Sequence, residues 1–595
     1  MFTTIILAEL NLCNIFNKNS AMKLFLAFLA VSIQLTWGYY NLKPLSYTQL
    51  PTSISSNVLR YDGINRGTAT DAAFDFVNHI MYVVGETSHF MHVIDIIDPA
   101  NPVLLFEHQF TKGEGIPKSV DVCGGDVAVA LAAPTNVHDG HVKIFRTHTR
   151  NSGAHDLVLD GYSTVGNYPK SLKYTPDCGT IVITNEGIAG KDEFGAYVNP
   201  QGSVSIIHGE RTGNPSVRLV DFTEYDHGKP KYNEKIRTPS VHIPEATISP
   251  RTPVSEDLEP EDLTISRDGR KAWVTLQENN AIAEIDINGG VVTSIKPISP
   301  KSWDKSRIDT SDRDGGIHRE LYPNLVSLRQ PGVIKSFEIG KNVFLFTGDE
   351  GAPKVYTRAL HGFDWTDMTS GYNLRTQIET FRPALLSNVS NNEILGRLEV
   401  STIDGRGPIS QKLDHLEAFG GRGFSVWNSG GDFSSPIFDS DGTLEEYMEA
   451  VHKNVFNTDY VPSPNYFSPE QSRDAVSNKQ GAQVTGLDIA TDNGTTFLVV
   501  GTWSTGTLYL YTVNTNTSQP IPSFQSIVRV GVENKPWGDL YGDRTVGDLY
   551  ITDLGIITSD HSPIDEPLLY VISNGGGSLS MYAIAQSSPG IPDPN

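Results

Sequence analysis

Short runs of apolar and β-branched residues, separated by clusters of Gly, Asp, Asn and Pro, make up most of the chain. The clearest group is EPEDLTISRDGRKAWVTLQENNAIAEIDI at residues 259–287, where a tight Asp268-Gly269 turn follows the first of three predicted strands, residues 263–266, 272–276 and 281–287. Only residues 444–456 show helical spacing. The pattern therefore predicts an all-β protein.

The same repeat, a strand, a turn and two further strands, recurs along the chain. Clear copies are residues 71–96, 116–146, 168–208, 330–351 and 482–513, and weaker ones are 415–428 and 553–584. Repeated meanders that cannot bury both faces alone are typical of β-propellers, with about 40–45 residues per blade. We predict seven or eight blades with long loop insertions at residues 209–258, 288–330, 352–412 and 431–480.

The predicted organisation has four parts. Residues 1–38 are an upstream extension plus a secretory signal peptide, in which Lys23 precedes a twelve-residue apolar stretch. Residues 39–67 are an N-terminal segment, residues 68–585 the propeller and residues 586–595 a polar tail. No later stretch approaches the roughly twenty apolar residues of a membrane-spanning helix, and the tail lacks the hydrophobic signal for a lipid anchor. We expect a secreted protein without a membrane span.

The net charge of -23 excludes long contacts with nucleic acid, which require clustered Lys and Arg. The acidic residues are spread over turns and strand ends rather than gathered in long runs. This distribution suits discrete calcium sites and solubility better than direct templating of mineral.

Two cysteines remain after removal of the signal, Cys123 and Cys178. They lie at equivalent first turns of adjacent repeats, so we predict a disulfide bond between them, with two separate buried thiols as the alternative. The sequons at Asn388, Asn493 and Asn516 are candidate glycosylation sites.

Several phrases resemble the mesenchyme-specific cell-surface glycoprotein family of biomineralising animals, whose bacterial relatives share a choice-of-anchor I region. They are DLEPEDLTISRDGRKAWVTLQENNAIAEIDI, DTSDRDG, LGRLEV with HLEAFGGRGFSVWN, and PLLYVISNGGGSLSMYAI. The resemblance implies an extracellular β-propeller glycoprotein associated with skeleton or shell deposition and with calcium. The chain departs from the family at Gln480-Gly481-Ala482 and Asn574-Gly575, which leaves any acid-lined site incomplete in the last repeats.

An acidic residue recurs after the second strand of the repeats, at Glu86, Glu186, Glu278 and Glu350, and Glu259 and Glu261 begin another repeat. Equivalent positions on successive blades would face a common rim, where carboxylates suit Ca²⁺. Alternatively, each glutamate only accepts hydrogen bonds from its own turn. Asp309, Asp312 and Asp314 resemble a calcium loop, although the spacing does not match an EF-hand.

Other motifs give weaker evidence for a functional site. His138-Asp139-Gly140-His141 lacks a third ligand for zinc. Gly420-Gly421-Arg422-Gly423 lacks the ending of a phosphate loop and predicts tight packing or a bulge instead. Asp439 and Asp441 are expected in a turn.

We therefore expect a secreted, glycosylated and calcium-associated matrix protein of mineralised tissue. It is expected to have no catalytic residues, and mineral or other matrix proteins are its expected partners. One alternative is a calcium-dependent phosphoesterase, for which Lys118, Lys170, Arg267 and Arg422 are candidate phosphate-binding residues. The other is a carbohydrate- or protein-binding propeller without metal. Fold alone does not separate these functions.

Overall fold

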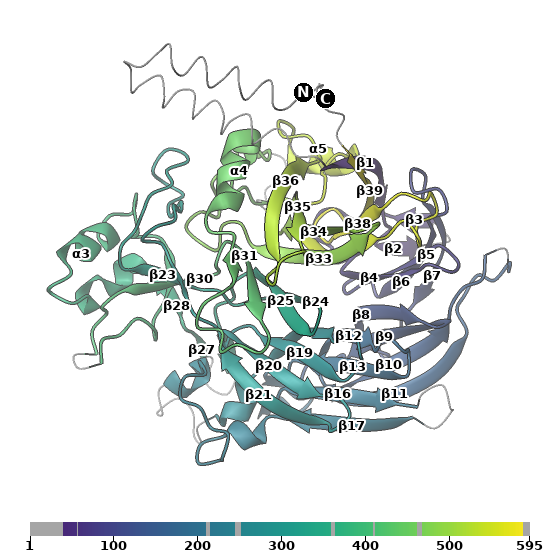
Figure 1. Ribbon diagram of the computed structural model, residues 1–595, viewed down its shortest axis with the longest axis horizontal. Helices are drawn as coiled ribbons and strands as arrows, with labels where there is room; N and C mark the ends of the chain where they lie inside the picture. The colour runs from purple at the N-terminus through teal and green to yellow at the C-terminus, as the bar shows by residue number, and fades with distance from the viewer. Residues whose placement is uncertain are drawn as a thin grey trace, which may run out of the picture.

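Seven four-stranded antiparallel sheets form a ring in the computed structural model of the chain (Figure 1). The structure describes residues 40–55, 58–150, 152–209, 215–243, 252–358, 363–408, 411–460 and 467–586, so the predicted signal peptide lies outside the described residues. Within these ranges the chain is a seven-bladed β-propeller with long insertions, and the predicted all-β class is confirmed.

The blades are numbered in chain order, and each is given from its innermost to its outermost strand. Blades 1 to 3 are β4–β7 (Asp71–Asp75, Ile80–Gly85, Phe90–Asp95, Val103–Gln109), β8–β11 (Ile116–Cys123, Asp126–Ala132, Asp139–Arg146, Leu159–Asn167) and β12, β13, β16 and β17 (Pro169–Tyr174, Thr180–Asn185, Ser203–His208, Ser216–Asp221). Blades 4 and 5 are β18–β21 (Pro260–Ile265, Lys271–Leu276, Ala281–Asp286, Val291–Pro297) and β24, β25, β31 and β32 (Val333–Ile339, Asn342–Asp349, Gly423–Asn428, Phe438–Asp439). Blades 6 and 7 are β33–β36 (Val484–Asp492, Thr495–Thr502, Thr507–Asn514, Ile521–Arg529) and β37–β39 with β1 (Ile551–Ile557, Leu568–Ser573, Ser578–Gln586, Tyr40–Gln49).

The innermost strands close the ring. They contact one another in the order β4, β8, β12, β18, β24, β33 and β37, and β37 contacts β4. Blade 7 is completed by β1, which pairs antiparallel with β39 from Tyr40 opposite Gln586 to Gln49 opposite Ser578. Residues 40–49 therefore lie within the propeller, although the sequence analysis set residues 39–67 apart, because the edge of β39 requires a backbone partner.

Each seam between neighbouring blades contains its own apolar cluster. Between blades 1 and 2, Tyr82 and Val93 pack with Val129 and Leu131, and similar clusters fill the other six seams. The second strand of a blade is buried on both faces, which explains the unbroken apolar run of β9.

The repeat predicted at residues 415–428 is not a separate blade. Its first half forms β30 (Leu416–Phe419) in a different sheet, and its second half forms β31 in blade 5. A long insertion separates β25 from β31, so one blade reads as two units in the sequence. The blade count is therefore seven rather than eight within the described residues.

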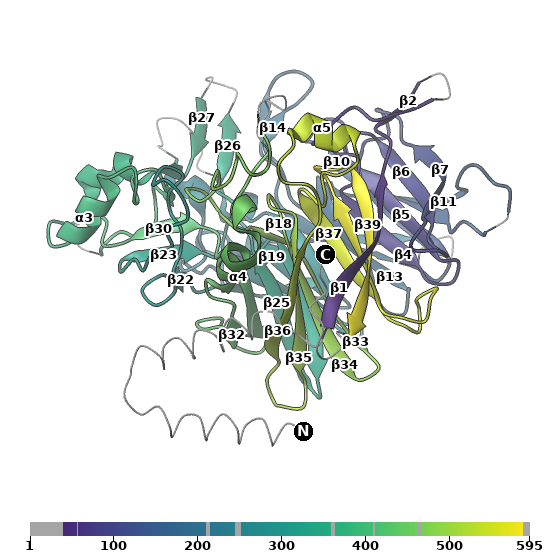
Figure 2. The ribbon, with the colours of Figure 1, turned by 90° about the horizontal axis from the view of Figure 1, so that it is seen from above.

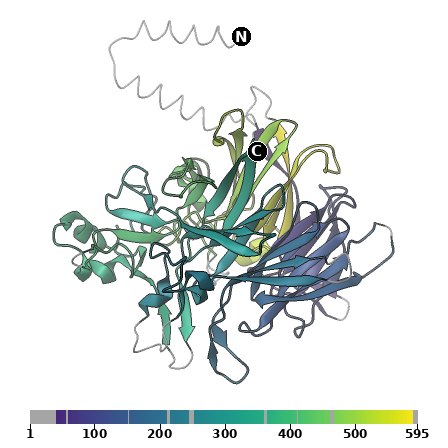
Figure 3. The ribbon, with the colours of Figure 1, turned by 60° about the horizontal axis from the view of Figure 1, so that its bottom comes forward.

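The insertions form a smaller body beside the ring (Figures 2 and 3). Its sheet has the order β22, β23, β30, β29 and β28 (Lys301–Ser302, Leu325–Leu328, Leu416–Phe419, Glu399–Ser401, Met368–Ser370), with β23 parallel to β30. The described α-helices are α3 (Pro383–Val389), α4 (Thr443–His452) and α5 (Trp537–Gly542). The helix predicted at residues 444–456 is confirmed as α4 and the 3-10 turn Lys453–Val455.

The remaining loops contain short hairpins and 3-10 turns. Three hairpins are β2 with β3 (Ser53–Ser55, Val58–Arg60), β14 with β15 (Gly190–Lys191, Tyr197–Val198) and β26 with β27 (Val355–Arg358, Phe363–Thr366). Further 3-10 turns are Thr223–Tyr225, Pro239–His242, Val254–Glu256 and Gly371–Gln377. None of the helices in the described ranges is both long enough and apolar enough to cross a membrane.

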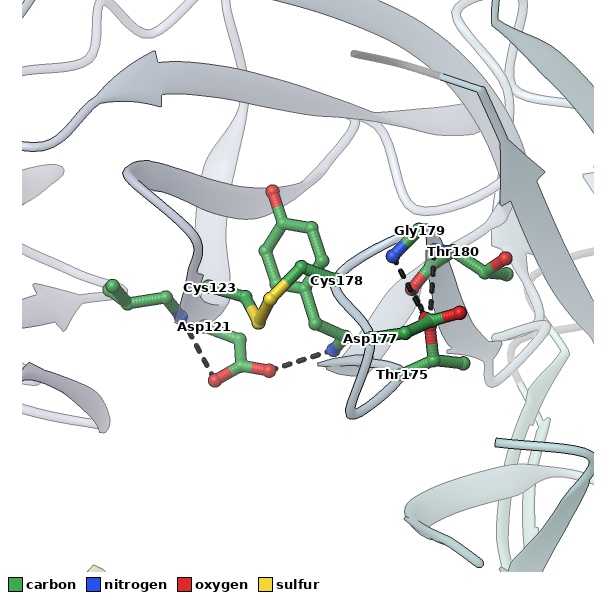
Figure 4. The surroundings of a disulfide bond; sticks show 9 residues. Asp121, Cys123, Thr175, Asp177, Cys178, Gly179 and Thr180 are labelled. Carbon is green, nitrogen blue, oxygen red and sulfur yellow. Dashed lines mark hydrogen bonds between the residues drawn. A yellow bond between two sulfur atoms is a disulfide. The ribbon is translucent and has the colours of Figure 1, made fainter. Parts of the chain in front are cut away.

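A disulfide bond joins Cys123 to Cys178, as predicted, with Cα atoms 5.5 Å apart (Figure 4). Cys123 ends β8 in blade 2, and Cys178 lies in the turn between β12 and β13 of blade 3. The same seam carries a hydrogen bond of 2.7 Å from the Tyr174 amide to the Asp121 carboxylate. The bond therefore braces two neighbouring blades at the end of the ring where the innermost strands finish.

Replacing both cysteines, Cys123→Ser with Cys178→Ser, is expected to lower the free energy of unfolding by about 2–4 kcal/mol, because a closed loop of this size restrains the unfolded chain. Chemical denaturation of the wild-type and double-variant proteins measures the difference. Adding reductant should weaken the wild type and leave the double variant unchanged. Equal stability of the two proteins, or free thiols in the wild type, would contradict the prediction.

Candidate functional site

The centre of the ring opens into a cavity of 410 Å³ at the end where the innermost strands begin. All seven blades line this cavity, which we call the channel mouth. One residue from each blade, in order, is Glu86, Lys118, Lys170, Glu261, Glu350, Trp503 and Asn574. Every blade thus helps to build the channel mouth.

The predicted glutamates gather at this end of the propeller. Glu86, Glu186, Glu278 and Glu350 lie at or just beyond the ends of second strands, and Glu259 and Glu261 lie at the start of β18. Antiparallel pairing brings the end of a second strand beside the start of the first strand. The repeat pattern thus identified a common rim, but not what the carboxylates contact there.

Lysine side chains neutralise most of these carboxylates. Lys118 Nζ lies 2.8 Å from Glu86, and Lys170 Nζ lies 3.2 Å from Glu261 and 3.5 Å from Glu186. Lys354 forms an ion pair with Glu259. The rim therefore carries charges of both signs, most of them held in ion pairs. No group of three or more His, Cys, Asp or Glu among the described residues is arranged to hold a metal ion, and calcium at this rim stays a prediction.

Burial has the largest effect on the pKa values of the rim carboxylates. Burial raises the pKa of Glu350 to about 7, while Lys170 and a 3.0 Å hydrogen bond from Gln277 act in the opposite direction. Burial also raises the pKa values of Glu259 and Glu261 well above the ordinary value, despite the neighbouring ammonium groups. Desolvation of the charged form outweighs ion pairing at these positions.

Aspartates on the innermost strands form a second layer, which the sequence analysis missed. Each accepts a hydrogen bond from a backbone amide of the following blade: Asp71 from Val120 (2.9 Å), Asp121 from Tyr174 (2.7 Å), Asp262 from Ile334 (3.0 Å), Asp488 from Ile556 (2.8 Å) and Asp553 from Ala72 (3.3 Å). These bonds tie blade to blade, including blade 7 to blade 1. The sequence signal that could have identified this layer is the aspartate that recurs in the first strand of several repeats.

Lys173 of blade 3 lies beside this layer. It occupies the repeat position that Asp121 occupies in blade 2. Burial lowers the pKa of Lys173, but the carboxylates of Asp71, Asp121 and Asp553 raise it above its ordinary value. Burial, reinforced by Asp71, raises the pKa of Asp553 to about 7. A single ammonium group thus balances carboxylates from several blades.

The predicted aspartate loop lies in the insertion, apart from the channel mouth. Asp312 forms a two-point ion pair with Arg397 at 2.7 and 2.9 Å. Asp309 is fully buried and accepts the His318 amide at 2.9 Å, and Asp314 accepts the Gly316 amide at 3.3 Å. The three aspartates therefore do not act as one ligand set.

Asp309 instead shares its surroundings with two acids that the sequence analysis missed, Glu445 and Asp474. Burial and the Glu445 carboxylate raise the pKa of Asp309 to about 7, and burial and Asp309 raise the pKa of Asp474 to about 8. Glu445 is held by Arg422 at 2.8 Å and Asn457 at 3.1 Å. These residues come from distant segments, so no spacing rule could have grouped them.

The proposed phosphate-binding residues are not brought together. Lys118 and Lys170 line the channel mouth, but Arg267 lies in an exposed turn, and Arg422 is buried in the insertion, where it also donates to the Asp309 carbonyl at 2.6 Å. Tight packing was predicted around Arg422, and its burial agrees with this.

The remaining weak motifs have structural partners. His138 pairs with Glu193 at 2.8 Å on the surface. Asp439 ends β32 rather than lying in the predicted turn, and it forms ion pairs with Arg329 at 2.6 Å and Lys301 at 3.2 Å. Asp441 lies in the turn that follows, as predicted.

The sequons lie on three different elements. Asn516 is exposed in the turn between β35 and β36, and Asn493 is exposed in the turn between β33 and β34, where its amide donates to Ser559 at 3.0 Å. Asn388 lies half-buried in α3.

Comparison with known proteins places the chain in a family. The profile of the choice-of-anchor I domain matches residues 70–516, from the start of blade 1 into blade 6. The chain belongs to this family. It is also similar to the mesenchyme-specific cell surface glycoprotein of Strongylocentrotus purpuratus, with 26% identity over 31% of this chain and 23% of that protein, which confirms the resemblance noted from the sequence.

A second relative of this choice-of-anchor I protein is Gigasin-3a of Magallana gigas, 28% identical over 36% of this chain and 72% of the relative. The matched segments thus span less than a quarter of the Strongylocentrotus purpuratus protein and most of Gigasin-3a. Among solved structures, the WD40 domain of Toxoplasma gondii coronin aligns over 93% of this chain and 88% of that chain, with 9% identity and a TM-score of 0.42.

The Asp309–Asp474 pair predicts a pH dependence that can be measured. A raised folded-state pKa means that folding binds a proton between about pH 4 and pH 8, so stability falls as pH rises through this range. Asp474→Asn removes the ionisation, and the loss of melting temperature from pH 5.5 to pH 8 should be smaller than in the wild type. The exposed substitution Asp432→Asn is the control. Parallel pH profiles for all three proteins would exclude this coupling.

Proposed function

We propose that this choice-of-anchor I protein is a secreted, glycosylated extracellular-matrix component of shell or skeleton that associates with calcium and catalyses no reaction. The relative from Strongylocentrotus purpuratus is named a cell-surface glycoprotein, which supports an extracellular location. The family resemblance noted from the sequence supports the link to mineralised tissue. Mineral or other matrix proteins are the proposed partners.

The disulfide between blades 2 and 3 carries the extracellular part of the proposal. Disulfide bonds of this structural kind persist in oxidising compartments and are rare in the cytosol. The exposed sequon at Asn516 fits the same compartment, because glycans are added to surface loops of secreted chains.

Calcium association is supported best by the acids of the insertion. Asp309, Asp314, Glu445 and Asp474 influence one another electrostatically, and carboxylate oxygens are the ligands that Ca²⁺ prefers. A divalent cation would relieve the repulsion that adds to burial in raising the pKa values of Asp309 and Asp474. Because Arg422 and Asn457 hold Glu445, the cation would bind through Asp309, Asp314 and Asp474 after a local rearrangement.

Calorimetric titration of the purified chain with Ca²⁺ tests this site. We expect a dissociation constant in the range of extracellular modules, about 0.1–1 mM, and tighter binding at pH 8 than at pH 6, because calcium competes with protons. Asp309→Asn with Asp474→Asn should abolish binding, and Asp432→Asn should not. No binding, or equal binding by the double variant, would refute the calcium assignment. Phosphomonoesterase turnover measured beside it would refute the non-enzymatic role.

Expression in secretory animal cells tests the compartment and the glycans. We expect export of a protein whose mass falls on enzymatic deglycosylation, with a glycan at Asn516, since this residue is exposed in a turn. Asn516→Gln should remove one glycan from the mass, whereas Asn514→Gln, at the end of β35 beside this turn and outside a sequon, should not. Retention of the chain inside the cell without glycan would contradict the proposal.

A further inference from the structure

The charges of the channel mouth are nearly balanced. Its lining contains four lysines and six Asp or Glu residues, of which Glu350 and Asp553 have pKa values raised to about 7. A cation would meet the ammonium groups, and an anion would meet the carboxylates. A neutral ligand that both donates and accepts hydrogen bonds avoids both kinds of repulsion.

The lining is also asymmetric. Blades 1 to 5 and blade 7 each contribute at least one charged residue, whereas blade 6 contributes only Thr485, Gly486, Leu487 and the half-buried Trp503. Trp503 is held in place by stacking on Tyr550, with ring centres 4.6 Å apart. The cavity therefore has one uncharged aromatic side facing sides rich in hydrogen-bonding groups.

Thr552 and Asn574 of blade 7 line this cavity, and each has a buried polar atom without a hydrogen-bond partner in the described structure, Thr552 Oγ1 and Asn574 Oδ1. Buried polar groups without partners are costly, so such atoms indicate that another molecule satisfies them. They lie on blade 7, the neighbour of the uncharged side formed by blade 6. The volume of 410 Å³ is within the range of about 300–1,000 Å³ found for pockets that enclose small ligands.

We propose that the channel mouth binds a neutral sugar, with its C–H face toward Trp503 and its hydroxyl groups toward Thr552, Asn574 and the lysines and carboxylates of the other blades. A sugar ring presents hydroxyl groups at its edge and C–H groups on its faces, and this distribution matches the lining. Lys173 also lines the cavity and adds a hydrogen-bond donor to it.

The test uses the full-length secreted chain and saturation-transfer NMR, followed by calorimetry. The probes are glucose, galactose, mannose, N-acetylglucosamine and their β-linked disaccharides at millimolar concentrations, with glucose 6-phosphate, inorganic phosphate and Ca²⁺ as charged comparisons. We expect at least one neutral sugar to bind and the charged probes not to displace it. Absence of binding by every neutral sugar, or displacement by Ca²⁺ or phosphate, overturns the proposal.

Variants locate the site. Trp503→Ala should weaken sugar binding at least tenfold, and Thr552→Val, which keeps the shape and removes the hydroxyl, by about threefold to tenfold. Tyr162→Ala, on the outer strand β11, is the control and should bind normally. Unchanged affinity of Thr552→Val overturns the proposal even if Trp503→Ala fails to fold. The Asp309→Asn, Asp474→Asn protein should still bind sugar, so this proposal and the calcium assignment can fail separately.

Discussion

The closed ring of seven innermost strands is the constraint on which the rest of the structure depends. Each blade buries its second strand only because a neighbouring blade lies on either face, so a missing neighbour would expose an apolar strand. Blade 7 has its fourth strand only through β1, which comes from the opposite end of the propeller sequence. The apolar seams, the aspartate bonds between blades and the channel mouth all follow from this closure.

Repetition also explains the chemistry of the channel mouth. Because the blades share one register, an acid just after the second strand arrives at the same rim, and in five blades an aspartate of the first strand reaches the next blade. Lysines at Lys118 and Lys170 occupy matching positions and pair with these acids. The rim is therefore a balanced polar surface rather than a concentrated negative one.

The fold was predictable from the sequence to a large extent, and the site less so. Strand spacing and tight turns revealed six of the seven blades clearly, and the spacing of Cys123 and Cys178 revealed their bond, because these features are local or repeat in register. Blade 5 was counted as two repeats in the sequence, because an insertion separates its second strand from its third. The association of Asp309 with Asp474 could not be predicted, because it depends on how an irregular insertion folds back on itself.

The pairing of β1 with β39 also orders the events of folding. Tyr40 and Gln586 lie 546 residues apart in the chain, yet their strands are direct neighbours. A ribosome makes β1 first and β39 last, so the first strand waits unpaired while six blades assemble. Folding that ends on so distant a contact is slow, and the waiting strand is exposed to wrong partners. The edge of β1 therefore stays open to wrong partners until the last strand of blade 7 has been made.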